Sequence, residues 1–192
     1  MACTDSIVKN IVSDCTTAKN GGMEVKVWIF PRQTYKNAIT YDNTLGNKIT
    51  SIASVQGAKA YAATGVKKLF NAGHDLVSAE DRPDKYTHFF SFQQFEISAA
   101  DIANVDNLND VFIVFERKDK ASDGDGTFVA LGVKNGLYKS SDTRRVNDVN
   151  GARVIEMTSM AGEEENVSEY TVLSTDYATT KSMLVALETA GT

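Results

Sequence analysis

The stretch from Phe128 to Tyr138, FVALGVKNGLY, carries the strongest local structural signal in the chain. Two apolar runs flank the dipeptide Asn135-Gly136, and both of these residue types tolerate the positive φ angles of the tight turns that join antiparallel strands. The pattern therefore predicts a β-hairpin whose two strands pair with each other. It indicates a strand-rich fold and, taken alone, no chemistry.

Length and charge favour one acidic domain. The chain has 192 residues, which suits a single domain spanning 1–192, and its 20 Lys and Arg against 25 Asp and Glu give a net charge of −5. An acidic surface repels phosphate backbones, which argues against a general nucleic-acid binder. The N-terminal arm, residues 1–22, lacks the basic start and apolar core of a signal peptide. Its cysteines, Cys3 and Cys15, are expected to be unpaired thiols, with a disulfide or a metal pair as the alternative.

Apolar residues at period two predict further strands. In Met23–Phe30 the odd positions are apolar, and Trp28 and Phe30 on the other face are expected to lie under a second layer or at a subunit contact. Residues 110–117 are almost continuously β-branched or aromatic, as in a strand that is covered on both faces. The other predicted strands are 38–41 and 48–55, which form a hairpin, then 86–97, 152–159 and 169–174, with 58–66 as a strand or a short helix.

The remaining segments complete the fold prediction. Ser98 lies three residues before Asp101, as in a capping box, and predicts a short helix ahead of the strand at 110–117. Residues 176–188 predict a terminal helix with one apolar side. Residues 67–85 are polar and poorly periodic, so we expect a long exposed loop there. The predicted fold class is mainly β, an antiparallel β-sandwich or barrel of about eight strands with one or two flanking α-helices.

No residue pattern predicts catalysis or a cofactor. The loop at 118–126 has spaced carboxylates before a glycine, but no EF-hand register supplies the final glutamate, so a solvated turn is predicted, with a weak irregular cation site as the alternative. His88 alternates with aromatic residues and is predicted to pack inside or at an interface, and His74 to lie in a loop. Cys15 has no activating neighbour. We therefore expect a protein that is not an enzyme, with no cofactor and no metal.

The order of these segments resembles the tail tube proteins of long-tailed bacteriophages and related prophages. The resemblance is one of pattern, covers most of the chain, and has the Leu-Gly…Asn-Gly-Leu segment as its most specific part. Residues 67–85 match least. The segments that carry it are the arm ending in Gly21-Gly22, the strand 23–30, THFFSFQQFEIS at 87–98, a short helix, VFIVFERKDKASDGDG at 111–126, FVALGVKNGLY, and GARVIEMTS at 151–159.

This resemblance implies a structural subunit of a phage tail tube. Copies of such a subunit close into hexameric rings, which stack into a hollow tube through which DNA passes without specific binding. The implied partners are the protein itself and other virion tail or neck proteins, with no membrane, and the implied location is the virion, assembled in the host bacterial cytoplasm. A negative net charge is consistent with a lumen through which DNA slides.

The resemblance, together with the density of aromatic residues, predicts two sets of subunit contacts. Strands of neighbouring subunits are expected to pair across the ring interface, which removes exposed sheet edges. The arm 1–22 and the loop 67–85 are expected to reach the adjacent ring, so deleting residues 68–84 should leave rings and abolish tubes. The predicted ring-closing residues are Tyr86, His88, Phe90, Phe92, Val111, Ile113 and Phe115. The predicted inter-ring contacts are Phe70, His74, Asp81 and Arg82.

Two alternative functions remain open at this point. One is a head-to-tail connector or capsid-associated ring protein of the same virion, because one fold hosts several roles. Such a protein forms a small assembly of fixed size rather than filaments. The other is a non-viral β-sandwich binding module, which is expected to be monomeric. Light scattering on the purified chain separates assembly from a monomer, and electron microscopy separates rings from tubes.

Overall fold

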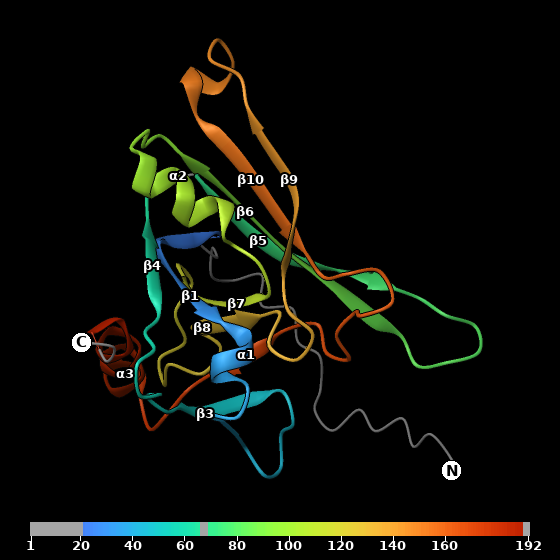
Figure 1. Ribbon diagram of the computed structural model, residues 1–192. Helices are drawn as coiled ribbons and strands as arrows, with labels where there is room; N and C mark the ends of the chain where they lie inside the picture. The colour runs from blue at the N-terminus through green and yellow to red at the C-terminus, as the bar shows by residue number, and fades with distance from the viewer. Residues whose placement is uncertain (1–20, 66–68, 190–192) are drawn as a thin grey trace.

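The computed structural model describes residues 21–65 and 69–189 and shows the predicted mainly β fold, built from two sheets (Figure 1). Sheet A has the strand order β2-β3-β11-β8-β7-β1-β4, and sheet B has the order β5-β6-β10-β9. The strands of sheet A are β1 (Met23–Pro31), β2 (Ile39–Tyr41), β3 (Lys48–Ile52), β4 (Tyr61–Thr64), β7 (Val111–Arg117), β8 (Phe128–Leu131) and β11 (Tyr170–Val172). Those of sheet B are β5 (Phe70–Val77), β6 (Lys85–Gln94), β9 (Tyr138–Arg144) and β10 (Arg153–Thr158).

Three α-helices and one short 3₁₀ turn accompany the sheets. The helix α1 (Arg32–Tyr35) is a single turn after β1, and the turn η1 (Val149–Gly151) lies between β9 and β10. The helix α2 (Ala99–Asp106) starts where the capping box predicts, because the Ser98 hydroxyl accepts the Asp101 N–H. The terminal helix α3 (Tyr177–Thr189) is confirmed, and the Asp176 carboxylate accepts the Thr179 N–H in its first turn.

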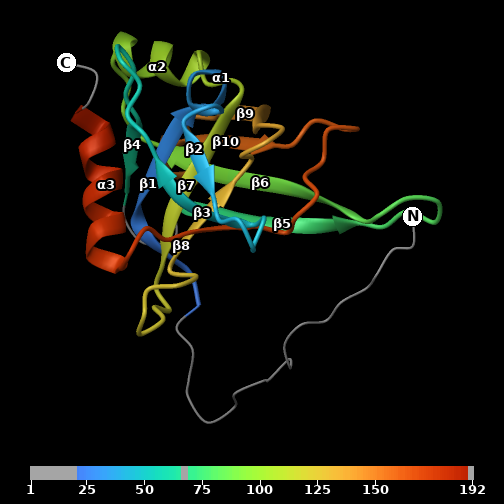
Figure 2. The ribbon, with the colours of Figure 1, turned by 90° about the horizontal axis from the view of Figure 1, so that it is seen from below.

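Sheet A lies between two hydrophobic cores, which explains why β8 and residues 111–115 of β7 are apolar at every position. In β7, Phe112 and Val114 face a core shared with α3, whereas Ile113 and Phe115 face sheet B. Figure 2 shows α3 beside β1 and β4, with the strands of sheet B running across those of sheet A. The predicted second layer over Trp28 and Phe30 is therefore confirmed, and it belongs to the same chain.

The predicted hairpin at 128–138 is wrong, although both of its strands exist. Strand β8 pairs with β7 and β11 in sheet A, whereas β9 pairs with β10 in sheet B. Asn135 lacks the positive φ that a type I′ turn needs, while Gly132 and Gly136 have φ of 73° and 87°. The Asn-Gly segment thus carries the chain from one sheet to the other. A turn is present with Gly136 at positive φ, but it is not the predicted hairpin turn, because pairing partners depend on contacts distant in the sequence.

The expectation of an exposed loop at 67–85 is wrong for residues 70–77 and right for 78–84, while 67 and 68 lie outside the described residues. Residues Phe70–Val77 form β5, which pairs antiparallel with β6 over eight residue pairs. Gly73 weakens the strand pattern in the sequence, yet a Cβ there would lie 2.9 Å from the Phe89 ring, so the glycine makes room for an aromatic on the neighbouring strand. Deleting residues 68–84 would remove this strand and is not a clean test of inter-ring contacts.

Sheet B extends beyond the body of the molecule in two directions (Figure 1). The ends of β5 and β6 form one projecting ribbon, and those of β9 and β10 form another. Within the described residues, no helix is long and apolar enough to cross a membrane.

Candidate assembly surfaces

Six of the seven predicted ring-closing residues are buried inside the protein, and Tyr86 is partly exposed, with its ring against His74. Phe90, Phe92, Val111, Ile113 and Phe115 are all buried in the core between the sheets. Strand β6 pairs with both β5 and β10, and β7 pairs with both β1 and β8, so neither has a backbone edge left for a neighbouring subunit. This placement corrects the predicted ring contact. The strong apolar pattern indicated burial, but the partner that buries these side chains is the other sheet of the same chain.

The free edges of the described sheets belong to other strands. Sheet A ends in β2 and β4, of three and four residues, whereas sheet B ends in β5 and β9, of eight and seven residues. Short edge strands are one way in which proteins prevent unwanted pairing, and long regular edges invite it. Sheet B is therefore the part of this subunit best suited to pairing with another chain.

His88 is buried and ties the sheet-to-sheet turn to β6. Its Nδ1 accepts the Gly132 N–H at 2.9 Å, and its Nε2 lies 3.0 Å from the Val167 carbonyl. An imidazole that accepts at Nδ1 must carry its proton on Nε2, which fixes a neutral ring. Burial lowers the pKa of His88, although the nearby Glu165 opposes the shift. The prediction of a packed histidine is confirmed, and the ring has a structural role in joining the sheets.

Glu165 holds the same turn from the opposite side. Its side chain is fully buried, and Oε1 accepts the N–H groups of Lys134 and Asn135 at 2.8 and 2.9 Å. The Tyr170 hydroxyl donates to Oε2 at 3.2 Å. Burial, followed by the Glu165 charge, raises the pKa of Tyr170. The sequence showed only an acidic turn here, because no local pattern reveals which of several neighbouring glutamates turns inward.

Arg32 and Asp110 close the third side of the turn. The Arg32 Nε donates to Asp110 Oδ1 at 2.5 Å, and its Nη1 donates to the Lys134 carbonyl at 2.7 Å. Burial alone would raise the pKa of Asp110, but hydrogen bonds from Arg32 and Gln33 lower it. The segment 132–136 is therefore held by side chains from β6, from α1 and from the link between β10 and β11.

A second polar network fastens α2 to the β9–β10 ribbon. Arg153 on β10 donates to Asp142 on β9 at 2.7 and 2.6 Å, and to Asp106 at the end of α2. Lys139 on β9 donates to the Val105 carbonyl at 3.0 Å. Sequence reasoning missed Arg153, since an arginine at the start of a strand gives no sign of its partners. The network holds the base of the ribbon in place.

The predicted inter-ring residues do not form one surface. Phe70 lies at the start of β5, packed against the core between the sheets and stacked with Phe90. His74 lies further along β5 with its ring against Tyr86. Asp81 and Arg82 are exposed beyond the end of β5, in the link to β6. Only the last two lie at the tip of a projecting ribbon, so they are the members of this set that an adjacent subunit can reach.

The outer face of sheet B is polar and poor in basic residues. The residues that alternate with the buried ones point away from sheet A. On the four strands they include Asn71, Asp75, Thr87, Ser91, Gln93, Ser141, Thr143, Glu156 and Thr158. The same alternation places Val77, Lys85, Phe89 and Val154 on this face, with Phe89 against Gly73. Hydroxyl, amide and carboxylate groups thus predominate on it.

The carboxylates of the loop at 118–126 are engaged by the protein itself. Asp123 accepts the Asp125 N–H, and Lys48 lies 3.4 Å from Asp125. No group of three or more His, Cys, Asp or Glu side chains suited to a metal occurs among the described residues. Beside the loop, burial opposes ionisation of Glu116, but hydrogen bonds from Lys120, Tyr177 and Lys181 lower its pKa. These contacts tie the loop to α3.

Comparisons with known proteins give no identification. No family model, curated protein or solved structure matches this chain. The function is therefore inferred from the fold and its surfaces.

Proposed function

We propose that the protein is a self-assembling structural subunit of a phage tail tube, whose copies form rings that stack into a conduit for DNA. The observation that carries the proposal is the pair of long free edges, β5 and β9, on the two sides of sheet B. Because these edges differ, pairing β5 of one copy with β9 of the next makes a head-to-tail contact. Such contacts generate closed rings when the rotation closes.

Ring closure through these edges would join the four-stranded sheets into one barrel. A barrel made from six copies of the four-stranded sheet B would have more strands than the roughly 16 to 18 at which barrels already enclose an aqueous channel. Every long edge of sheet B would then be paired, which removes the sites for uncontrolled strand addition. The pairing strands are thus β5 and β9 in place of the β6 and β7 positions that the sequence suggested.

The polar outer face of sheet B supports the same role. If this face lines the channel, its hydroxyl, amide and carboxylate groups meet the DNA, with Asp75 and Glu156 contributing negative charge. A surface of this kind repels phosphates and does not hold them, which suits passage without binding. A connector ring of the same virion shares this argument and differs in forming a single ring of fixed size.

The edge contact is tested by placing like charges across it. A variant carrying Asn71→Lys, Asp75→Lys, Ser141→Lys and Thr143→Lys should stay monomeric by sedimentation velocity, because lysines on both edges would face each other in the ring. The control is Thr87→Lys with Glu156→Lys, which adds positive charge to the same face on the interior strands β6 and β10. The control should still form rings in negative-stain micrographs.

Four results decide the proposal. Stacked rings from the wild-type chain support a tube subunit, and single rings of uniform size support the connector. A wild-type chain that remains monomeric over a wide concentration range, or an edge variant that assembles as readily as the wild type, would contradict pairing through β5 and β9.

A further inference from the structure

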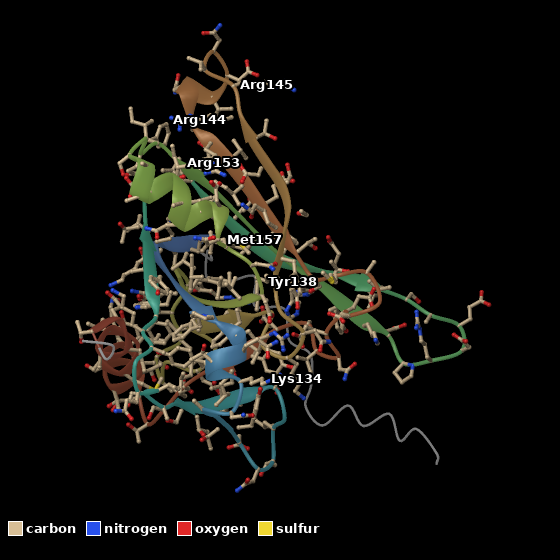
Figure 3. All side chains as sticks on the ribbon, viewed as in Figure 1. Lys134, Tyr138, Arg144, Arg145, Arg153 and Met157 are labelled. Carbon is tan, nitrogen blue, oxygen red and sulfur yellow. The ribbon has the colours of Figure 1, made fainter. Side chains whose placement is uncertain are left out.

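The far end of the β9–β10 ribbon displays apolar and basic side chains to solvent. Val146 is 83% exposed and Val149 49% exposed, the former being the most exposed large apolar residue of the described chain. Arg144 and Arg145 lie at the same end (Figure 3). The Arg144 Nε donates to the Gly151 carbonyl, whereas Arg145 extends outward with only a 3.6 Å contact to Asp148. We name residues 144–151 the ribbon tip.

Two residues of the ribbon tip have a left-handed backbone conformation. Val149 and Asn150 have φ of 47° and 55°. The left-handed region costs an L-residue about 1–2 kcal/mol, and it is exceptional for a β-branched side chain. Hydrogen bonds from the Gly151 N–H to the Asp148 carbonyl and from the Ala152 N–H to the Val149 carbonyl hold this conformation. Here it maintains a tight turn that exposes Val149, although both valines contribute little to the core of their own subunit.

A groove on another part of the molecule has the complementary chemistry. It has a volume of about 640 Å³ and lies between β4, the ends of β5 and β6, and α2. Its size falls within the roughly 300–1,000 Å³ that is typical of binding pockets. Apolar side chains form much of its lining, including Tyr61, Phe70, Phe92 and Leu108.

The polar groups of the groove call for a basic occupant. Its two charged lining residues are both carboxylates, Glu96 and Asp101. Asp101 is engaged in the cap of α2, but exposed Glu96 has no hydrogen bond or ion pair with any residue that the structure describes. Gln94 Oε1 is buried and lacks a hydrogen-bond donor, while the Gln94 amide donates to the Asp101 carbonyl. The free carboxylate of Glu96 is therefore the polar group of the groove that an incoming basic side chain can reach.

We propose that the ribbon tip of one copy seats in this groove of a second copy. Val146 and Val149 cover the apolar lining, and Arg145 pairs with Glu96. The inference rests on the proposed function, because it adds a second contact to the same assembly. Tip and groove are different surfaces, so this contact is also head-to-tail and can be repeated. A hairpin tip is smaller than a standard interface, and it gains strength when many such contacts act together.

The test is a charge exchange between the two surfaces. Arg145→Glu and Glu96→Arg should each raise the concentration needed for half-maximal assembly about tenfold, because each places like charges opposite one another. The chain carrying both changes should assemble at nearly the wild-type concentration, since the pair is restored with reversed sign. Sedimentation velocity measures assembly, and circular dichroism with thermal unfolding checks that each variant is folded.

Matched controls separate this contact from general charge effects. Glu163→Arg and Lys36→Glu make the same charge changes at exposed positions outside both surfaces and should leave assembly unchanged. If the wild type assembles and both single variants assemble at the same concentration as the wild type, this inference alone is overturned. The same holds if the double variant assembles no better than the single variants. A wild-type chain that never assembles overturns the proposed function as well.

Discussion

The two sheets of this protein differ in how many of their faces are covered and in the length of their edge strands. Sheet A is covered on both faces, by α3 and by sheet B, and its edge strands are short. Sheet B is covered on one face, has long edge strands, and extends into two ribbons beyond the body (Figure 1). Sheet A therefore contains most of the buried apolar strand residues, whereas sheet B carries the long free edges through which we propose that copies meet. The difference teaches that apolar density marks the core, while free edges mark the assembly surface.

The largest expected effect compares one phenylalanine from each environment. Phe112 is fully buried in sheet A and stacks on Phe30 with ring centroids 4.7 Å apart, whereas Phe89 is half-buried on the outer face of sheet B. Phe112→Ala should lower the free energy of unfolding by about 3–5 kcal/mol. Phe89→Ala should cost about 1 kcal/mol. Urea unfolding measures both, and equal losses would remove the distinction between the sheets.

The next effect concerns the turn that connects the sheets. A Cβ at Gly132 would lie 2.6 Å from Leu137 Cγ, and the φ of 73° disfavours any L-residue. Gly132→Ala should lower the free energy of unfolding by about 3 kcal/mol, from backbone strain and overpacking together. Gly126 has nearly the same φ, 74°, but nothing within 4 Å of its would-be Cβ. Gly126→Ala should therefore cost only about 1–2 kcal/mol, and an equal cost at both positions would mean that packing around the turn is unimportant.

A smaller effect depends on pH and on the buried His88. Because burial lowers the pKa of His88 in the folded protein, the unfolded chain takes up the proton first as the solution is acidified. Stability should therefore fall below about pH 6.5, by at most about 1.4 kcal/mol per pH unit from this group. His88→Gln should reduce the slope between pH 6.5 and 5, and His74→Gln serves as the control at the other histidine. Thermal unfolding across this range measures the slope, and an unchanged slope in His88→Gln would exclude His88 as its source.

The smallest expected effect on stability lies at the ribbon tip. Val146→Asp removes an apolar side chain that is 83% exposed, so the free energy of unfolding should change by less than about 0.5 kcal/mol. Its assembly should nevertheless weaken if the tip docks on another copy. Chemical denaturation and sedimentation of the same sample provide the two readings. A large loss of stability would show that the tip belongs to the core of its own subunit.

Some features could be predicted from the sequence alone. The strand at Met23–Pro31, the fully covered β7, the cap at Ser98 and the terminal helix follow from patterns within a few residues, and the structure contains each of them. The mainly β fold class follows from the number and spacing of such segments. These features are determined locally because the period of apolar side chains and the chemistry of caps act between neighbours along the chain.

Tertiary structure alone decided which strands pair and which edges remain open. The segment 128–138 has the local chemistry of a hairpin, but β8 and β9 belong to different sheets. The poorly periodic segment Phe70–Val77 forms a strand because it pairs with β6 over eight residue pairs. The partners that hold the turn, His88 and Glu165, come from positions more than 28 residues away in sequence. Pairing and burial depend on the whole chain, since backbone hydrogen bonds are alike in every strand and only packing selects among them.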